Sequence, residues 1–236
     1  MKIKNIPKII AIIPDGNRRW AKSHTFSIMK GYDLGVKKFI DFSEWCVSYG
    51  INNIAVWAFS TENFSRDSKE IKTLFSIYKK VANDKKLISR LHKNKTRLKI
   101  IGNKKLLPRD LLTALNKVEK ETSKYKDRVI NMLIAYGGKD DIMHAVKEVI
   151  TKVSSEVNSI KKLNEEIFSR YLISNSISDI DLIIRTSGEE RLSGFMPWQT
   201  SYSELYFSKK LWPDFTKKDL EAALQEYNKR QRRFGR

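Results

Sequence analysis

Cysteine and histidine are scarce in this sequence. Cys46 is the only cysteine among 236 residues, and His24, His92 and His144 lie far apart without a spacing typical of a metal site. A single thiol can form neither a disulfide framework nor a zinc site built from cysteines. We therefore expect a protein of a reducing compartment, with Cys46 in the core and the histidines at the surface.

Long apolar runs and the common nucleotide-binding glycine motifs are also missing. No apolar segment approaches the ~20 residues that span a bilayer, and residues 1–4 lead into a strand, unlike a signal peptide. Neither Gly-x-Gly-x-x-Gly nor a phosphate-binding loop ending in Gly-Lys-Ser/Thr is present, so the usual dinucleotide redox and nucleotide hydrolysis sites have no support. We expect a cytoplasmic protein that could touch a membrane only at its surface.

Positive charge, in contrast, is in excess. The chain has 46 Lys and Arg against 27 Asp and Glu, a formal charge of +19. Such a balance predicts an anionic partner, which could be nucleic acid, a phosphorylated small molecule or an acidic membrane surface. Lysines such as Lys79, Lys80, Lys85 and Lys86 are equally typical of a solvated helix face, so charge alone does not select among these partners.

Apolar segments of strand type alternate with segments of helical periodicity. Strands are predicted at 9–13, 51–59, 97–102, 129–136, 181–185 and 204–207, and helices at 33–49, 68–92, 108–125, 140–153, 163–174 and 216–231. This alternation predicts a mostly parallel central sheet with right-handed crossovers, flanked by helices. No repeat, low-complexity tract or linker divides the chain, so we predict a single α/β domain over residues 1–236.

Polar clusters follow three of the predicted strands. They are the segments 15–17 (Asp-Gly-Asn), 60–63 (Ser-Thr-Glu-Asn) and 185–188 (Arg-Thr-Ser-Gly). Carboxyl ends of parallel strands meet at one edge of the sheet, where ligands of such folds bind. One polar strand end is usually just a loop, but three at one edge predict a site.

The first cluster has chemistry that suits a diphosphate. Gly16 can take a positive φ in the turn, and Arg18 and Arg19 place two guanidinium groups beside it. Asp15 offers a hard oxygen ligand for Mg²⁺ at the same place. The alternative is a strand that simply ends in a polar turn.

A second anion-binding cluster is predicted at Arg185, Arg191 and Ser193. Two such clusters suggest two phosphorylated substrates, each held by arginine forks. The alternative is a pair of surface arginine clusters neutralised by Glu189 and Glu190.

An apolar stripe follows the cluster at 60–63. Ile71, Leu74, Phe75 and Tyr78 have helical spacing, which ordinarily indicates a core face. Beside two diphosphate clusters, the same stripe could line an apolar cavity or tunnel for a lipid chain.

Motifs along most of the chain resemble those of the cis-prenyltransferases, the undecaprenyl diphosphate synthase family. They are Asp15-Gly16-Asn17-x-Arg19-Trp20-Ala21, Ala58-Phe59-Ser60-Thr61-Glu62-Asn63, Tyr136-Gly137-Gly138, the segment 181–193, Trp198-Gln199, 204–207, 211–215 and Arg233-Phe234-Gly235. The resemblance implies a homodimeric, Mg²⁺-dependent enzyme that condenses isopentenyl diphosphate with an allylic diphosphate to form a long polyprenyl diphosphate with cis double bonds. It also implies a glycosyl-carrier lipid precursor as product, membrane contact through that lipid, and no nucleic-acid partner.

The resemblance also assigns roles to individual residues. It implies that Asp15 holds Mg²⁺ and assists departure of the allylic diphosphate, that Asn63 helps to remove the proton, and that Glu204 is a further Mg²⁺ ligand. The substrate-binding residues that it implies are Gly16, Asn17, Arg18, Arg19, Trp20, Ser60, Thr61, Glu62, Phe64 and Arg66 for the allylic side, and Arg185, Arg191, Leu192 and Ser193 for isopentenyl diphosphate.

The sequence departs from the bacterial family pattern beside the first cluster. Pro14 and Arg18 replace a Met and a Gly, while Ile28 and Tyr32 stand where an Arg and a His are found. These changes, with residues 194–199, resemble the archaeal branch, and Arg18 could replace the missing guanidinium.

Two other functions remain open on the sequence alone. One is prenyl transfer from an allylic diphosphate to a different acceptor, such as a prenylglycerol compound. The other is a basic nucleic-acid-binding module or a non-catalytic subunit, for which neither Asp15 nor the apolar stripe would be needed.

Overall fold

Six parallel strands form the central sheet of the computed structural model, which describes residues 3, 5–153 and 162–230. The strands are β1 (Ile9–Ile13), β2 (Asn53–Ser60), β3 (Thr96–Ile101), β4 (Arg128–Tyr136), β5 (Leu182–Arg185) and β6 (Glu204–Phe207). Their order is β3-β4-β2-β1-β5-β6, and all five pairings are parallel. The predicted α/β domain with a mostly parallel sheet is confirmed, and the sheet described here is parallel throughout.

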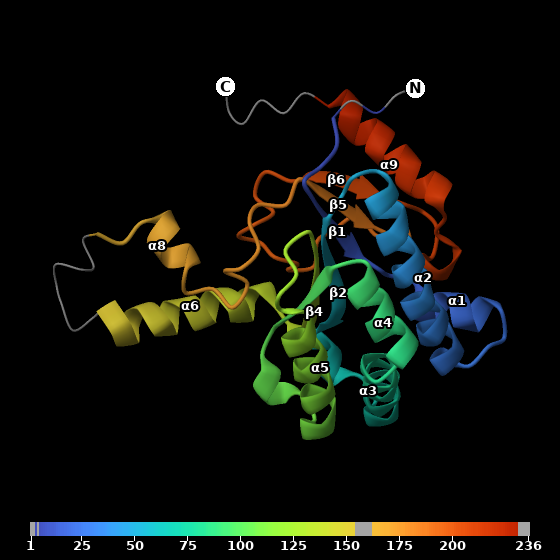
Figure 1. Cartoon of the computed structure of the whole chain (residues 1–236), viewed down its shortest axis with the longest axis horizontal. Coiled ribbons are helices and arrows are strands. Elements are labelled where there is room, and N and C mark those ends of the chain that lie inside the picture. The colour runs from blue at the N-terminus through green and yellow to red at the C-terminus, as the bar shows by residue number, and fades with distance from the viewer. Residues whose placement is uncertain (1–2, 4, 154–161, 231–236) are drawn as a thin grey trace.

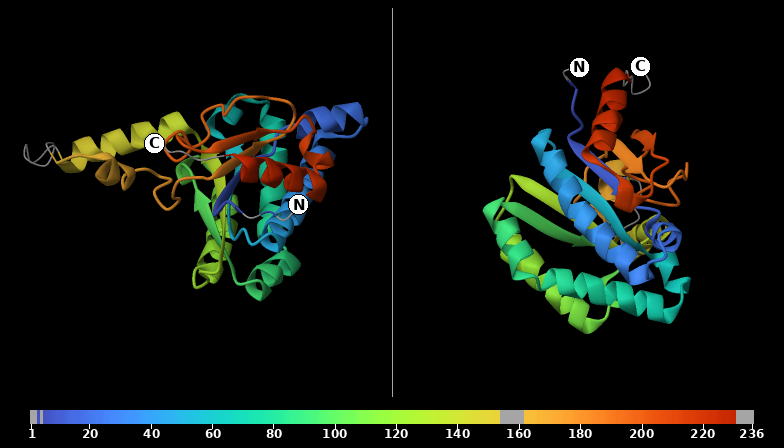
Figure 2. Two further views of the ribbon diagram at one scale, coloured as in Figure 1. Left: turned by 90° about the horizontal axis from the view of Figure 1, so that it is seen from above. Right: turned by 90° about the vertical axis from the view of Figure 1, so that its right-hand side faces the viewer.

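Helices cover the sheet and extend from it (Figures 1 and 2). They are α1 (Asn17–Ser23), α2 (Ile28–Ser48), α3 (Ser68–Ala82), α4 (Lys85–Lys93), α5 (Arg109–Thr122), α6 (Gly138–Val153), α8 (Glu165–Ser169) and α9 (Lys217–Lys229), with 3₁₀ turns η1 (Thr61–Ser65), η2 (Lys104–Leu106) and η3 (Trp212–Asp214). Figure 1 shows α2 to α5 grouped together, while α6 and α8 project sideways from the body. Within the described residues, no helix is long and apolar enough to cross a membrane.

The central strand β1 explains the position of the first polar cluster. All five residues from Ile9 to Ile13 are buried, because β2 and β5 flank the strand, helices α2 and α9 cover one face, and the non-helical segments 177–180 and 195–196 cover the other. Uniformly apolar strands are typical of parallel sheets covered on both sides. The chain leaves this core at Pro14, so the polar residues that follow lie at the carboxyl edge of the sheet.

The predicted helix over 68–92 is wrong, because the chain forms two helices there. Helix α3 ends at Ala82, and the Asp84 carboxylate then accepts hydrogen bonds from the Lys86 and Leu87 amides, 2.8 and 3.2 Å away. An aspartate that satisfies free amides in this way starts a new helix. The apolar periodicity of residues 68–92 continues across the break between Ala82 and Lys85, so the sequence pattern did not reveal two separate helices.

The predicted helix over 163–174 is also wrong beyond its first turns. Helix α8 ends at Ser169, and the following backbone turns so that the Ile173 amide and the Ser174 hydroxyl both donate to the buried Asp141 carboxylate. This tertiary contact replaces the helical hydrogen bonds that the pattern suggested. The last predicted helix is confirmed as α9 (Lys217–Lys229) with Thr216 as its N-cap, and the final predicted position, 231, lies outside the described residues.

Candidate active site

The turn after β1 is fixed by contacts to two distant segments. Gly16 has φ 105°, and a Cβ there would lie 2.9 Å from Leu211 Cδ2. The Asp15 carbonyl accepts hydrogen bonds from Thr186 Oγ1 at 2.7 Å and from the Trp212 amide at 3.0 Å. Only glycine combines that φ with so close a neighbour, so the turn sets the position of Asp15 at the edge of the sheet.

The Asp15 carboxylate joins the clusters that follow β1 and β5. Its Oδ2 lies 2.9 Å from Arg185 Nη2, and its Oδ1 lies 3.7 Å from Arg19 Nη2. The Arg185 side chain, only 6% exposed, also donates to the Arg191 carbonyl and, at 2.9 Å, to Ser193 Oγ. The two predicted anion-binding clusters are therefore neighbours in the folded chain, as parallel strand order requires.

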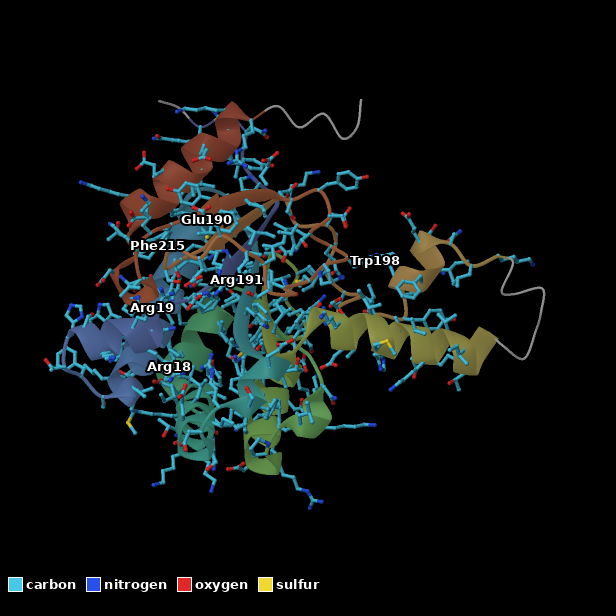
Figure 3. All side chains as sticks on the ribbon, turned by 180° about the vertical axis from the view of Figure 1, so that it is seen from behind. Arg18, Arg19, Glu190, Arg191, Trp198 and Phe215 are labelled. Carbon is cyan, nitrogen blue, oxygen red and sulfur yellow. The ribbon has the colours of Figure 1, made fainter. Side chains whose placement is uncertain are left out.

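Glu189 lies between the two arginine clusters. Its two carboxylate oxygens lie 3.4 Å from Arg19 Nη1 and 2.5 Å from Arg191 Nη1. Glu189 therefore pairs with an arginine of each cluster, as the alternative interpretation expects. Both arginine side chains nevertheless stay accessible, with Arg19 49% exposed and Arg191 61% exposed. Exposed pairs of this kind contribute little free energy, so both guanidinium groups can exchange the carboxylate for a diphosphate. Figure 3 labels Arg18, Arg19 and Arg191 along this edge.

The cluster after β2 is held by a reciprocal cap. Ser60 Oγ accepts from the Asn63 amide, Asn63 Oδ1 accepts from the Ser60 amide, and both distances are 3.2 Å. This arrangement closes the 3₁₀ turn η1. It also fixes the Asn63 side chain at the carboxyl end of β2.

A fourth group of polar side chains, centred on the Glu70 carboxylate, lies at the carboxyl end of the sheet. No role for Glu70 was predicted from the sequence. The hydroxyl of Tyr32 donates to Glu70 Oε1 at 2.7 Å and accepts from Arg66 Nη1 at 2.8 Å, while Arg18 Nε lies 3.7 Å from the same carboxylate oxygen. Burial, and next the hydrogen bond to Glu70, raise the pKa of Tyr32 well above its ordinary value. The spacing of Arg66 and Glu70, four residues apart at a helix start, was the available signal.

These groups surround the mouth of a cavity of about 1100 Å³. The predicted residues among its lining are Asp15, Gly16, Asn17, Arg18, Arg19, Ser60, Glu62, Asn63, Arg66, Arg185 and Ser193. Deeper in, the lining is mainly apolar and comes from α2 to α5 and the strands, including Leu74, Tyr78, Val81, Leu91, Leu98 and Val118. Its volume slightly exceeds the range of about 300–1,000 Å³ that is typical of ligand pockets.

The apolar stripe on α3 is divided between cavity and core. Leu74 and Tyr78 line the cavity. Phe75 instead packs against Phe59 and Phe64, with ring centroids 5.0 and 6.1 Å apart. The stripe therefore contributes to the cavity wall and to the core through different residues, and its role in holding a lipid chain stays a prediction.

Several residues that the resemblance assigned to substrate contact have other neighbours. The Trp20 indole donates to Asp214 Oδ1 at 2.7 Å, Thr61 packs against the backbone of Gly137, and Leu192 packs against the core beside β5. Phe64 belongs to the aromatic group of Phe59 and Phe75. Trp20, Thr61, Phe64 and Leu192 are not among the residues that line the cavity, and their substrate-binding roles stay predictions.

Glu204 lies at the amino ends of the strands, whereas Asp15 lies at their carboxyl ends. Glu204 is the first residue of β6 and is aligned with Leu182 of β5, which in turn is aligned with Ile10 of β1. Asp15 comes two residues after the last residue of β1. Its carboxylate Oε2 is 2.7 Å from Arg230 Nη1. Within one chain, therefore, Glu204 and Asp15 do not form a common metal site, and the metal-ligand role of Glu204 stays a prediction.

Comparison with known proteins agrees with this geometry. A family model described as "Putative undecaprenyl diphosphate synthase" matches residues 13–235. The curated Tritrans,polycis-undecaprenyl-diphosphate synthase (geranylgeranyl-diphosphate specific) of Pyrococcus horikoshii is 40% identical over 237 residues, covering 100% of this chain and 90% of the relative. Dehydrodolichyl diphosphate synthase 1 of Arabidopsis thaliana is 42% identical over 233 residues, which cover 98% of this chain and 76% of that relative.

Solved structures show the same relationship. The crystal structure of lavandulyl diphosphate synthase from Lavandula x intermedia in complex with dimethylallyl diphosphate has a TM-score of 0.92 at 33% identity and 98% coverage of both chains. A probable undecaprenyl diphosphate synthase from Campylobacter jejuni has a TM-score of 0.79 at 32% identity, covering 98% of this chain and 100% of its own. The chain belongs to the undecaprenyl diphosphate synthase family of prenyltransferases.

Proposed function

We propose that the protein elongates an allylic diphosphate with isopentenyl diphosphate, in a Mg²⁺-dependent reaction, to a long-chain cis-polyprenyl diphosphate that serves as a glycosyl-carrier lipid precursor. The observation that carries this proposal is the position of Asp15, between Arg19 and Arg185 at the mouth of an apolar cavity. Two anion-binding clusters suit two diphosphates, and the cavity suits the growing hydrocarbon. A nucleic-acid-binding module would have no use for such a cavity.

The proposed division of labour follows the two clusters. Arg18 and Arg19 bind the allylic diphosphate and stabilise the negative charge that develops as its carbon–oxygen bond breaks. Arg185, Arg191 and Ser193 hold isopentenyl diphosphate beside it, so that its double bond forms the new carbon–carbon bond. A proton is then lost from the isopentenyl unit to an oxygen of the released diphosphate, and we assign the orientation of that oxygen to the Asn63 side-chain NH2 group, which the contact of Oδ1 with the Ser60 amide holds in place.

The donor set at the mouth fits Mg²⁺. The described residues contain no group of three side chains that could hold a metal ion, but Mg²⁺ commonly binds one or two carboxylates together with substrate phosphate oxygens. Asp15, whose side chain is 34% exposed, would supply that carboxylate. The bound ion would stabilise charge on the departing diphosphate.

For the starter, we propose a C20 allylic diphosphate. The relatives from Pyrococcus horikoshii and Methanopyrus kandleri are both named as geranylgeranyl-diphosphate specific, whereas the lavender structure contains the C5 compound dimethylallyl diphosphate. The test is to incubate the protein with Mg²⁺, labelled isopentenyl diphosphate and C5, C10, C15 or C20 allylic diphosphates. We expect the C20 compound to give the highest kcat/KM. Failure to consume isopentenyl diphosphate with every starter would contradict elongation and favour another acceptor, such as a prenylglycerol compound.

Replacing Arg191 by alanine should separate the two diphosphate sites. We expect KM for isopentenyl diphosphate to rise at least about tenfold, roughly 1.4 kcal/mol, with less than a threefold change for the allylic substrate, because Arg191 belongs to the Arg185 cluster. Arg170→Ala, which removes another exposed arginine paired with a glutamate, is the matched control. Equal increases in both KM values would show that the division is wrong.

Two neighbouring substitutions on α3 test the role of the cavity. Leu74 lines it, whereas Phe75 packs on Phe59 and Phe64. We expect Leu74→Ala to lengthen the product, because it makes room for further C5 units whose burial is favourable by ~25 cal/mol per Å². Phe75→Ala should lower the free energy of unfolding by about 3–5 kcal/mol and leave product lengths unchanged. The same product lengths for wild type and Leu74→Ala would remove the tunnel assignment.

We also propose a cytoplasmic homodimer that contacts the membrane surface through its lipid product. The family resemblance supports the dimer, and the apolar product gives the reason for the membrane contact. Sedimentation of the purified protein should give twice the monomer mass of 27.6 kDa. A monomer at micromolar concentration would contradict the dimer.

A further inference from the structure

The Glu70 carboxylate is a buried centre at which three side chains meet. Its side chain is 8% exposed, and its Oε1 lies 2.7 Å from the Tyr32 hydroxyl, 3.2 Å from Arg66 Nη1 and 3.7 Å from Arg18 Nε. A buried carboxylate is costly unless it is paired and hydrogen-bonded, and here it has two guanidinium partners and one hydroxyl. The carboxylate therefore balances positive charge that would otherwise be crowded at this point.

The three partners of Glu70 face the active-site cavity, whereas Glu70 stands behind them. Arg18 comes from α1, Tyr32 from α2 and Arg66 from the segment between η1 and α3, and all three line the large cavity. Glu70 lies instead beside a smaller hollow lined also by Ile28 and Met29. It can thus orient groups that reach a substrate without touching the substrate itself.

The Tyr32 hydroxyl is engaged in this cluster on both sides. It donates its proton to Glu70 and accepts a hydrogen bond from Arg66, and a phenol has only one proton to give. While the cluster is intact, Tyr32 cannot donate to a diphosphate or act as an acid. Its hydroxyl serves as a link that aligns Arg66 with Glu70.

The cluster belongs to one diphosphate site and not to the other. Arg18 directly precedes Arg19, which contacts Asp15, so the guanidinium groups aligned by Glu70 lie on the allylic side of the proposed site. The contacts of Arg185 are with Asp15, Arg191 and Ser193, and none of these is a partner of Glu70. Loss of the Glu70 charge should therefore disturb one substrate more than the other.

We propose that Glu70 is a positioning residue for the allylic diphosphate, acting through Arg18, Arg66 and Tyr32. This inference rests on the proposed function, since it assigns the cluster to one of the two proposed substrates. Without the carboxylate, the two guanidinium groups repel each other and lose the arrangement in which both can meet one diphosphate.

The test compares Glu70→Gln, Tyr32→Phe and a control, Asp110→Asn. The control removes an exposed carboxylate of α5 that is paired with Lys79 of α3, the helix that contains Glu70. For Glu70→Gln we expect KM for the allylic diphosphate to rise at least tenfold and KM for isopentenyl diphosphate to change less than twofold. Tyr32→Phe should shift the same KM in the same direction by a smaller factor, and Asp110→Asn should shift neither. A general loss of folding would not separate the two KM values.

Binding without turnover keeps this inference distinct from the proposed function. Calorimetry with an unreactive C20 allylic thiolodiphosphate should give a dissociation constant at least tenfold weaker for Glu70→Gln than for wild type, whether or not isopentenyl diphosphate is consumed. Equal affinities for the two proteins, or equal increases of both KM values, would overturn the positioning role. If Glu70→Gln does not fold, the same two measurements on Tyr32→Phe decide the question, since this variant keeps the Glu70 carboxylate and its two arginine partners.

Discussion

Replacing Asp15 by asparagine should lower kcat/KM at least about 100-fold, roughly 2.7 kcal/mol in the barrier. Asparagine keeps an oxygen within reach of Arg185 but removes the charge that, in the proposed reaction, would face both diphosphates and hold Mg²⁺. A metal-dependent departure of diphosphate depends on that charge. Steady-state rates with saturating Mg²⁺ and each substrate varied in turn give the measurement.

Stability should fall less in the same variant than in Arg185→Ala. Asparagine leaves the carbonyl contacts of residue 15 unaffected and still offers an oxygen to the buried Arg185 guanidinium, so we expect the free energy of unfolding to fall by about 1–2 kcal/mol, less than when a buried pair is broken outright. Asp33→Asn, which removes another partly exposed carboxylate from an ion pair with Lys37, is the control. Activity above about a tenth of wild type in Asp15→Asn would contradict the metal role.

Replacing Arg185 by alanine should impair both activity and stability. Its side chain is 6% exposed and holds the Asp15 carboxylate, the Arg191 carbonyl and Ser193 Oγ. Breaking a buried ion pair costs about 3–5 kcal/mol, and we expect the lower end because Asp15 is partly solvated. kcat/KM should fall at least about 100-fold, since the second cluster loses its buried arginine and Asp15 of the first cluster loses its 2.9 Å partner.

Urea unfolding and kinetics on Arg185→Ala and Arg185→Lys together test this account. Lysine keeps the charge but cannot form two parallel hydrogen bonds, so it should retain more stability than alanine while still losing most activity. Wild-type stability in Arg185→Ala would mean that the contacts to Asp15 and Ser193 do not stabilise the chain.

The location of the site could be predicted from the sequence because it depends on short segments, each an apolar strand followed directly by polar turn residues. A uniformly apolar segment such as Ile9–Ile13 indicates a strand covered on both faces, and the turn residues after it mark its carboxyl end. Parallel strand order then brings Asp15 and Arg185 together, as their 2.9 Å contact shows. The same logic applied to Glu204, the first residue of its strand, would have placed it at the opposite edge.

The remaining features depend on contacts between distant residues. Asp141 determines the backbone at Ile173 and Ser174, 32 and 33 positions away, and no periodicity reveals this. Glu70 has the spacing of an ordinary surface ion pair with Arg66, and only the approach of α1 and α2 brings Arg18 and Tyr32 to it. The split of the α3 stripe between Leu74 and Phe75 likewise depends on which helix face meets the cavity.

The geometry of the newly formed double bond tests the central claim most directly. After a single addition of labelled isopentenyl diphosphate to the preferred allylic diphosphate, the product can be isolated and its new trisubstituted double bond assigned by NMR. The account predicts one C5 unit added with a cis double bond, only in the presence of Mg²⁺ and at least about 100-fold less efficiently with Asp15→Asn. A trans double bond, or transfer of the prenyl group without any isopentenyl unit in the product, would contradict it.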